Sequence, residues 1–259
     1  GAQLVASRLK DLEFQVRTYQ PLANQTKDDL KREIKAWTRT LPGNAQVLVF
    51  LSGHGMEVQG ERYFVAQEVK FDKDMPDQIV AMAKENCVRL EWIKKHVMNV
   101  LEKDGLLMSF WDCCRQDFLK AAEKRRVMRD KTGSAPMIRY MPKLKQKLWQ
   151  TDYDSAGWVT VFASSSASLA FGGKKWGGYL TRALIKWWDN PELVALDIRD
   201  KRVKDHLDNS VAEFGAKQAD NKRQMPEWRE SGKPNFRFKE EVQSAARNVF
   251  VEGAPSAPC

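Results

Sequence analysis

The stretch VLVFLSGHG at residues 47–55 decides the fold of this chain. Its first five residues form a continuous β-branched and apolar run, which is typical of a strand buried on both faces of a parallel sheet. The stretch LLMSFWDCCR at residues 106–115 has the same design, an apolar run that leads into polar and reactive side chains. Two buried strands that each end in chemically capable residues are therefore predicted.

The segments that flank these two runs alternate between helical and strand patterns. Apolar residues at helical spacing predict helices over residues 2–12, 26–41, 88–103, 179–188 and 191–214. Strands are expected at residues 14–19, 158–163 and 235–238, and a hairpin at residues 56–66 with Gly60 at its tip. This order predicts an α/β fold, with a mostly parallel central sheet and helices on both faces.

Reactive groups in an open parallel sheet gather beyond the carboxyl ends of the strands. His54 follows the first apolar run, and Cys114 follows the second. A histidine can hold or transfer a proton near neutral pH, and a thiol is a strong nucleophile. Adjacent or nearly adjacent strands would place the two side chains together as a catalytic pair. Because side chains alternate along a strand, we expect Cys113 to face away from Asp112 and Cys114 and to be a core cysteine.

The ordered pair of motifs, Ser-Gly-His-Gly and then Asp-x-Cys-Arg, resembles the signature of the caspase superfamily of cysteine peptidases. The acidic residue at position 112 is similar to that of the metacaspase and paracaspase branches. The resemblance covers roughly residues 1–240. It implies a caspase-like domain with a large-subunit-like part over 1–116, a basic linker over 117–153 and a small-subunit-like part over 154–245. The family's first strand has no counterpart, so a fragment whose sheet lacks one central member is expected.

The resemblance also implies a role for each motif residue. Cys114 would be the nucleophile and His54 the general base or proton donor, while the backbone amides of Gly55 and Cys114 would form the oxyanion hole. Asp112 would lie in the primary specificity pocket and pair with an arginine or lysine of the substrate. The implied activity is a cysteine endopeptidase that cleaves after basic residues and needs no cofactor.

Serine residues follow the strand expected at 158–163. No Gly-x-Ser-x-Gly elbow surrounds them, so we expect Ser164 and Ser165 to line the substrate groove rather than to act as nucleophiles.

The sequence departs from the paracaspase pattern at two places. Gly1 and Gly172 stand where that branch carries two further carboxylates, and a pocket with one carboxylate should hold arginine less firmly. A catalytically impaired, caspase-like pseudo-peptidase that acts as a scaffold is therefore the alternative function. Residues 84–86, KEN, stand where calcium-dependent metacaspases carry paired aspartates, so no calcium or other metal site is expected.

Composition narrows the remaining possibilities. The cysteines at positions 87, 113, 114 and 259 form neither a disulfide framework nor a zinc pattern, so a reducing, cytoplasmic compartment is expected. The sequence has no apolar run of about 18 residues and predicts no membrane span. The tail, residues 246–259, is predicted to be disordered. Protein or peptide substrates are the expected partners, and a homodimer is left open.

The net charge is +9, and the basic residues concentrate between positions 120 and 147. This stretch is interpreted as a solvated basic loop, and nucleic acid is not the expected partner. Because it is long, is interrupted by Gly133 and Pro136 and is rich in arginine, it is the expected self-cleavage region, at Arg125, Arg126 or Arg129.

Overall fold

The computed structural model describes residues 2–19, 26–66, 76–113, 116–117, 156–164, 172–173, 177–216, 224–231 and 247–253. Its central feature is a six-stranded sheet within these residues, in the spatial order β1 (Gln15–Tyr19), β12 (Arg247–Gly253), β2 (Gln46–Gly53), β6 (Leu106–Cys113), β8 (Gly157–Phe162) and β11 (Glu227–Ser231). The pairings are parallel except that between β11 and β8 at one edge. The predicted α/β class and mostly parallel sheet are confirmed.

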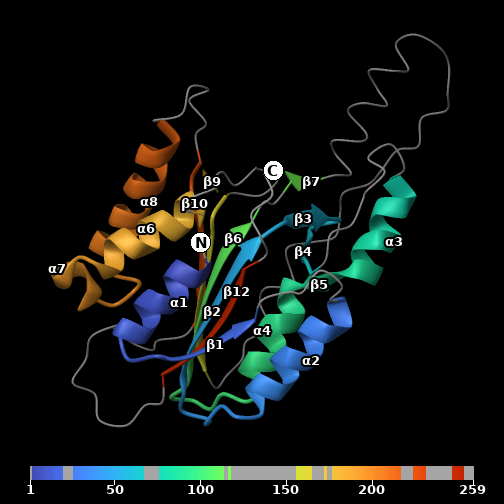
Figure 1. Ribbon diagram of the computed structural model, residues 1–259, viewed down its shortest axis with the longest axis horizontal. Helices are drawn as coiled ribbons and strands as arrows, with labels where there is room; N and C mark the ends of the chain where they lie inside the picture. The colour runs from blue at the N-terminus through green and yellow to red at the C-terminus, as the bar shows by residue number, and fades with distance from the viewer. Residues whose placement is uncertain are drawn as a thin grey trace.

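Helices cover both faces of this sheet (Figure 1). One face carries α1 (Ala2–Asp11), α6 (Tyr179–Trp188), α7 (Pro191–Val194) and α8 (Lys201–Ala216), and the other carries α2 (Lys27–Thr38) and α4 (Leu90–Met98). The position of β2 between these two helix groups explains why residues 47–51 are apolar without interruption. Leu48 and Phe50 pack with the first helix group, whereas Val49 and Leu51 pack with the second. Each buried side chain of this size contributes about 1.5–3 kcal/mol to folding.

The C-terminal strand β12 lies in the second position of the sheet, parallel to both β1 and β2. The expectation of a disordered tail is therefore wrong for residues 247–253, and the sheet does not lack a central member. This segment forms a strand because three consecutive apolar side chains are buried alternately on the two faces of the sheet. Val249 and Val251 enter one core and Phe250 enters the other, which fills the space between β1 and β2.

A second sheet forms beside the carboxyl end of β2, in the order β5 (Cys87–Arg89), β4 (Glu61–Val65), β3 (Gly55–Val58) and β7 (Gln116–Asp117). The β3–β4 hairpin turns at Gln59 and Gly60, whose φ angles are 54° and 77°. Two positive φ values at the central residues are typical of a type I′ turn, which matches the right-handed twist of the strands. The predicted hairpin, with Gly60 at its tip, is confirmed.

Several element boundaries differ from the predicted ones. Residues 76–86 form α3 (Pro76–Asn86), which the periodicity did not predict, and the helix expected over 88–103 is split into β5 and α4. The helix expected over 191–214 is split into α7 and α8. Thr26 caps α2, since its hydroxyl accepts a hydrogen bond from Asp29 N at 3.3 Å.

The remaining strands are β9 (Gly172–Gly173) and β10 (Gly177–Gly178), which pair antiparallel just before α6. None of the helices in the described part of the chain is both long enough and apolar enough to cross a bilayer. The strand expected at 235–238 and the basic stretch 120–147 lie outside the described residues.

Candidate active site

The two motif strands lie next to each other with their carboxyl ends at the same edge of the sheet (Figure 1). In the parallel pairing of β2 with β6, Gly53 is the partner of Cys113. Neighbouring strands are about 4.8 Å apart, so the chain leaves the sheet from two closely spaced points. His54 is the next residue after Gly53. Cys114, the residue after Cys113, lies outside the described residues.

The backbone of His54 is fixed from both sides. It joins β2 to β3, and its carbonyl oxygen accepts a hydrogen bond from Val65 N at 2.9 Å. The next residue, Gly55, is buried and pairs with Phe64 across the hairpin. The His54 side chain is half-buried. The hairpin therefore holds a partly accessible imidazole at the carboxyl end of the sheet.

Cys113 lies in the core, as predicted. Its side chain is 2% exposed and packs in the hydrophobic cluster that contains Leu51 and Trp111. It is a free thiol. Asp112, one residue earlier on β6, lies toward the opposite face, where its carboxylate meets α6. The alternation of faces along β6 therefore separates these two polar side chains.

The carboxylate of Asp112 is buried against the N-terminus of α6, with 5% of the residue exposed. Its Oδ2 accepts hydrogen bonds from Thr181 N at 3.2 Å and from the Thr181 hydroxyl. Its Oδ1 makes no hydrogen bond of ordinary geometry to a described residue, although the backbone of Gly178 lies beside it. A Cβ at position 178 would collide with both carboxylate oxygens, so only glycine allows this close approach.

Burial raises the pKa of Asp112 from 3.8 to about 6. The hydrogen bonds from Thr181 oppose this effect because they stabilise the ionised carboxylate, and the backbone of Gly178 also lowers the pKa. The N-terminus of a helix also favours a negative charge. Asp112 is therefore mostly ionised at neutral pH and becomes protonated in mildly acidic solution.

Sequence analysis missed Thr181 and Gly178 as partners of Asp112. The signal available was weak, since a glycine before a helix and a threonine in its first turn are common in any helix start.

Of the two serines expected to line the substrate groove, one lies within the described residues. Ser164 is 1% exposed, and Ser165 lies outside the described residues. The neighbouring carbonyl of Ala163 accepts a hydrogen bond from Gln224 Nε2 at 2.7 Å. This contact ties the end of β8 to the segment that leads into β11.

A buried arginine, which sequence analysis also missed, anchors the hairpin. Arg62 on β4 is 3% exposed, and its guanidinium lies 4.6 Å from the ring centre of Phe162. Its Nη1 lies 3.9 Å from a carboxylate oxygen of Glu91, and its Nη2 lies 3.8 Å from one of Glu227. The hairpin that follows His54 is therefore joined to α4 and to the edge strand β11.

Within the described residues, no group of three or more histidine, cysteine or acidic side chains is placed to hold a metal ion.

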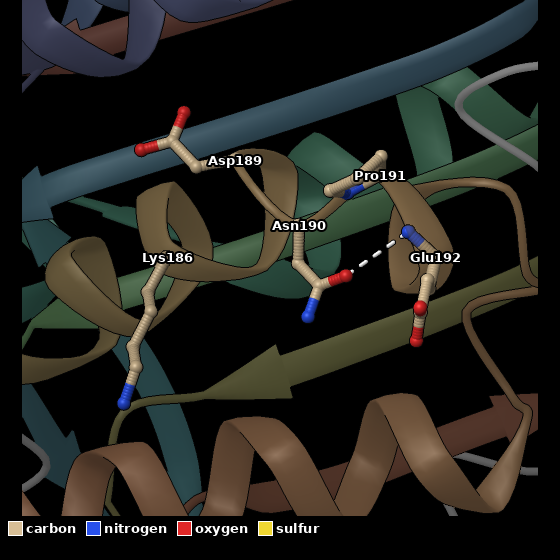
Figure 2. Close-up of a pocket in the computed structure, with 5 residues that line it drawn as sticks. All are labelled: Lys186, Asp189, Asn190, Pro191 and Glu192. Carbon is tan, nitrogen blue, oxygen red and sulfur yellow. Dashed lines mark hydrogen bonds between the residues drawn. The ribbon is translucent and has the colours of Figure 1, made fainter.

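A surface hollow lies where α6 meets α7 (Figure 2). There Asn190 Oδ1 accepts a hydrogen bond from Glu192 N at 3.0 Å, while Asp189 pairs with Arg8 and Lys186 pairs with Glu213. These groups cap helices and form surface ion pairs, and they are not arranged for chemistry.

Solved structures share this fold. Caspase-1 from Spodoptera frugiperda superimposes with a TM-score of 0.55 at 13% identity, over 94% of this chain and 82% of that one. A protein from Geobacter sulfurreducens superimposes with a TM-score of 0.51 at 12% identity, over 90% of this chain and 83% of that one. At such identities these likenesses show the fold alone. The class defined is therefore a caspase-like α/β domain.

Sequence comparison gives the family. Residues 2–236 match the caspase domain of peptidase family C14. This chain therefore belongs to the caspase-domain family of cysteine peptidases. A comparison with curated proteins finds no significant match. The family match ends before β12, so the strand that fills the second position of the sheet comes from outside the matched region.

Proposed function

We propose that this protein is a cysteine endopeptidase in which His54 and Cys114 form the catalytic pair. The observation that carries the proposal is the parallel register of β2 and β6, in which Gly53 pairs with Cys113 immediately before the two reactive residues. Membership of a peptidase family supports the same reaction class and makes proteins or peptides the expected substrates.

In the proposed mechanism, His54 accepts the proton of the Cys114 thiol, and the sulfur attacks the carbonyl carbon of the scissile peptide bond. The backbone amides of Gly55 and Cys114 stabilise the negative oxygen that develops. The protonated imidazole then gives its proton to the departing amine, which leaves a thioester on Cys114. Water hydrolyses the thioester with His54 again as the base, and the free thiol is restored.

We further propose cleavage after arginine or lysine, with Asp112 as the residue that recognises the basic side chain. Its support is a buried carboxylate, two residues before the nucleophile, with one oxygen held by Thr181 and the other free of ordinary hydrogen bonds to described residues. A buried ionised oxygen of this kind is stabilised by a cation. Ser165 is proposed to line the same groove, whereas Ser164, which is 1% exposed, is buried just beyond the end of β8 and does not line it.

The proposal is tested with purified variants and fluorogenic peptides that differ only in the residue before the cleaved bond. Cys114→Ala should abolish hydrolysis, while Cys113→Ala, a core substitution, should retain most of it. Asp112→Asn should lower kcat/KM for arginine peptides by at least about tenfold, because it removes a charged contact. Full activity of Cys114→Ala would contradict the proposed nucleophile.

The alternative is a pseudo-peptidase scaffold. The observation that favours it is that Thr181 already engages one oxygen of Asp112, in a chain that has Gly172 at a family acidic position. A scaffold would leave every peptide in the panel intact while the folded protein retained its thermal unfolding transition.

Self-processing is proposed at Arg125, Arg126 or Arg129, which lie outside the described residues. Incubation of the purified chain, followed by sequencing of new N-termini, tests it. Cleavage in the wild type but not in Cys114→Ala supports self-processing, and an intact chain that still hydrolyses peptides contradicts it.

A further inference from the structure

A pocket of about 170 Å³ lies outside the candidate active site, and His54 and Asp112 are not among its lining residues. Its walls come from α2, the end of α3, β4, β5 and α4, which gather on one side of the molecule (Figure 1). Its lining includes Lys31, Glu61, Tyr63, Lys84, Arg89 and Trp92. The peptidase mechanism uses none of them.

Positive charge converges on this pocket from three separate elements. Lys31 comes from α2, Lys84 from the last turn of α3 and Arg89 from β5. Lys27 and Lys35 lie one helical turn on either side of Lys31. The ammonium group of Lys27 donates a hydrogen bond to the carbonyl oxygen of Lys84 at 2.7 Å, which joins α2 to α3 at the rim.

The acidic group in the lining is already engaged. Glu61 pairs with Arg89 at 2.8 Å through one oxygen and accepts a hydrogen bond from the Tyr63 hydroxyl at 2.7 Å through the other. Glu61 therefore balances Arg89 and leaves the ammonium groups of Lys31 and Lys84 without a carboxylate in the lining. Asp28, on the preceding turn of α2, is an attractive neighbour of Lys31 from outside the lining.

The lysines gather over the indole of Trp92 despite their mutual repulsion. The ammonium nitrogens of Lys31 and Lys35 lie 5.3 and 5.8 Å from the ring centre. The ring of His96 also contacts this indole, with ring centres 3.8 Å apart and planes tilted by 31°. The attraction of a cation to an aromatic face is slightly stronger than the repulsion between like charges four residues apart. Burial, and after it the charge of Lys27, lower the pKa of Lys31. The charged form of Lys31 is therefore destabilised here, and a bound anion would stabilise it.

We propose that this pocket binds a small anion that carries two or more phosphoryl groups. Its volume equals that of about six liquid water molecules, which suits a short phosphate chain and is too small for a macromolecular strand. Lysine ammonium groups are compact point charges that bind phosphate well. The proposal is independent of the peptidase activity.

Isothermal titration calorimetry of the full chain with sodium tripolyphosphate at low ionic strength tests the proposal. We expect saturable binding that weakens with added salt and falls in the order tripolyphosphate, pyrophosphate, phosphate. The double variant Lys31→Gln/Lys84→Gln should bind tripolyphosphate at least about tenfold more weakly, because it loses two charged contacts. The control is Lys201→Gln on α8. The ammonium group of Lys201 pairs with Asp205 at 2.7 Å, far from the pocket lining, so this variant should bind tripolyphosphate like the wild type.

Lysine acylation read by mass spectrometry locates the anion independently. Tripolyphosphate should protect Lys31 and Lys84 from acylation and leave Lys201 unprotected. Absence of binding, or equal affinity in the double variant, would overturn the proposal. Protection confined to the lysines between positions 120 and 147 would also overturn it, since the anion would then belong to the basic linker. A thermal unfolding midpoint shared by the variants and the wild type shows that any loss is local.

Discussion

Thr181, in the first turn of α6, donates both its backbone N–H and its hydroxyl hydrogen to Oδ2 of Asp112 at the end of β6. A single residue therefore joins α6 to β6, the strand that precedes Cys114 in the sequence. These hydrogen bonds also favour the ionised form of the carboxyl group that is proposed to recognise a basic substrate residue.

The pH dependence of cleavage follows from this contact. Because burial raises the pKa of Asp112 to about 6, kcat/KM for arginine peptides should rise as the pH rises through about 6. Thr181→Val removes the hydroxyl donor while it keeps the shape, so the rise should move to higher pH and kcat/KM at pH 6 should fall roughly tenfold. Thr181→Ser, which restores a hydroxyl, is the control and should behave like the wild type. A profile that is identical in all three proteins would show that Thr181 does not set the charge of Asp112.

The ionisation of Asp112, which should favour cleavage of arginine peptides, should lower the stability of the folded protein. A raised pKa in the folded state means that the native state holds the proton more tightly than the unfolded state does. The stability from this group is therefore present below about pH 4 and is lost as the pH rises to about 6. The loss amounts to about 3 kcal/mol, from the difference between 3.8 and about 6 at 1.36 kcal/mol for each pH unit. Asp112→Asn should remove this component from urea unfolding measured across that range.

Glu252 on β12 is expected to destabilise the folded protein at neutral pH. Its side chain is fully buried, neither carboxylate oxygen has a hydrogen-bond partner among the described residues, and burial raises its pKa well above 4.5. Glu252→Gln should therefore raise the free energy of unfolding at pH 7 by about 1–3 kcal/mol, and the gain should shrink as the pH falls toward 4.5.

The control for this substitution is Glu230→Gln on β11, which removes an exposed ion pair with Lys204 and should change the stability by less than about 1 kcal/mol. A destabilised Glu252→Gln protein at pH 7 would show that the carboxylate has a partner that its described surroundings do not supply.

Removal of β12 should prevent folding. This strand pairs with β1 and β2 and buries Val249, Phe250 and Val251, each worth about 1.5–3 kcal/mol, against a total stability of about 5–15 kcal/mol for a typical domain. A chain cut after residue 246 should lose its cooperative unfolding transition in circular dichroism. A chain cut after residue 253, which keeps β12, is the matched control and should unfold like the full chain. A cooperative transition in the shorter chain would mean that β12 does not complete the sheet.

The parts of the fold that could be predicted from sequence are those whose cause is local. Residues 47–51 are apolar without interruption because both faces of β2 are covered, and the type I′ turn at Gly60 needs a glycine. The position of β12 could not be predicted, because only three of its residues show the two-sided pattern and their parallel partners lie far along the chain. The contact of Thr181 with Asp112 was missed for the same reason, since it exists only where α6 meets the end of β6.

The central proposal is that Cys114 is a nucleophile activated by His54, and the register of Gly53 with Cys113 supports it. The most direct measurement is covalent labelling with a peptidyl ketone that ends in arginine and reacts with thiolates, mapped by mass spectrometry of the digested protein. We expect rapid labelling of Cys114, none at the buried Cys113, and labelling slowed by at least about a hundredfold in His54→Ala. Labelling of Cys113 instead, or labelling of Cys114 at the same rate in His54→Ala, would contradict it.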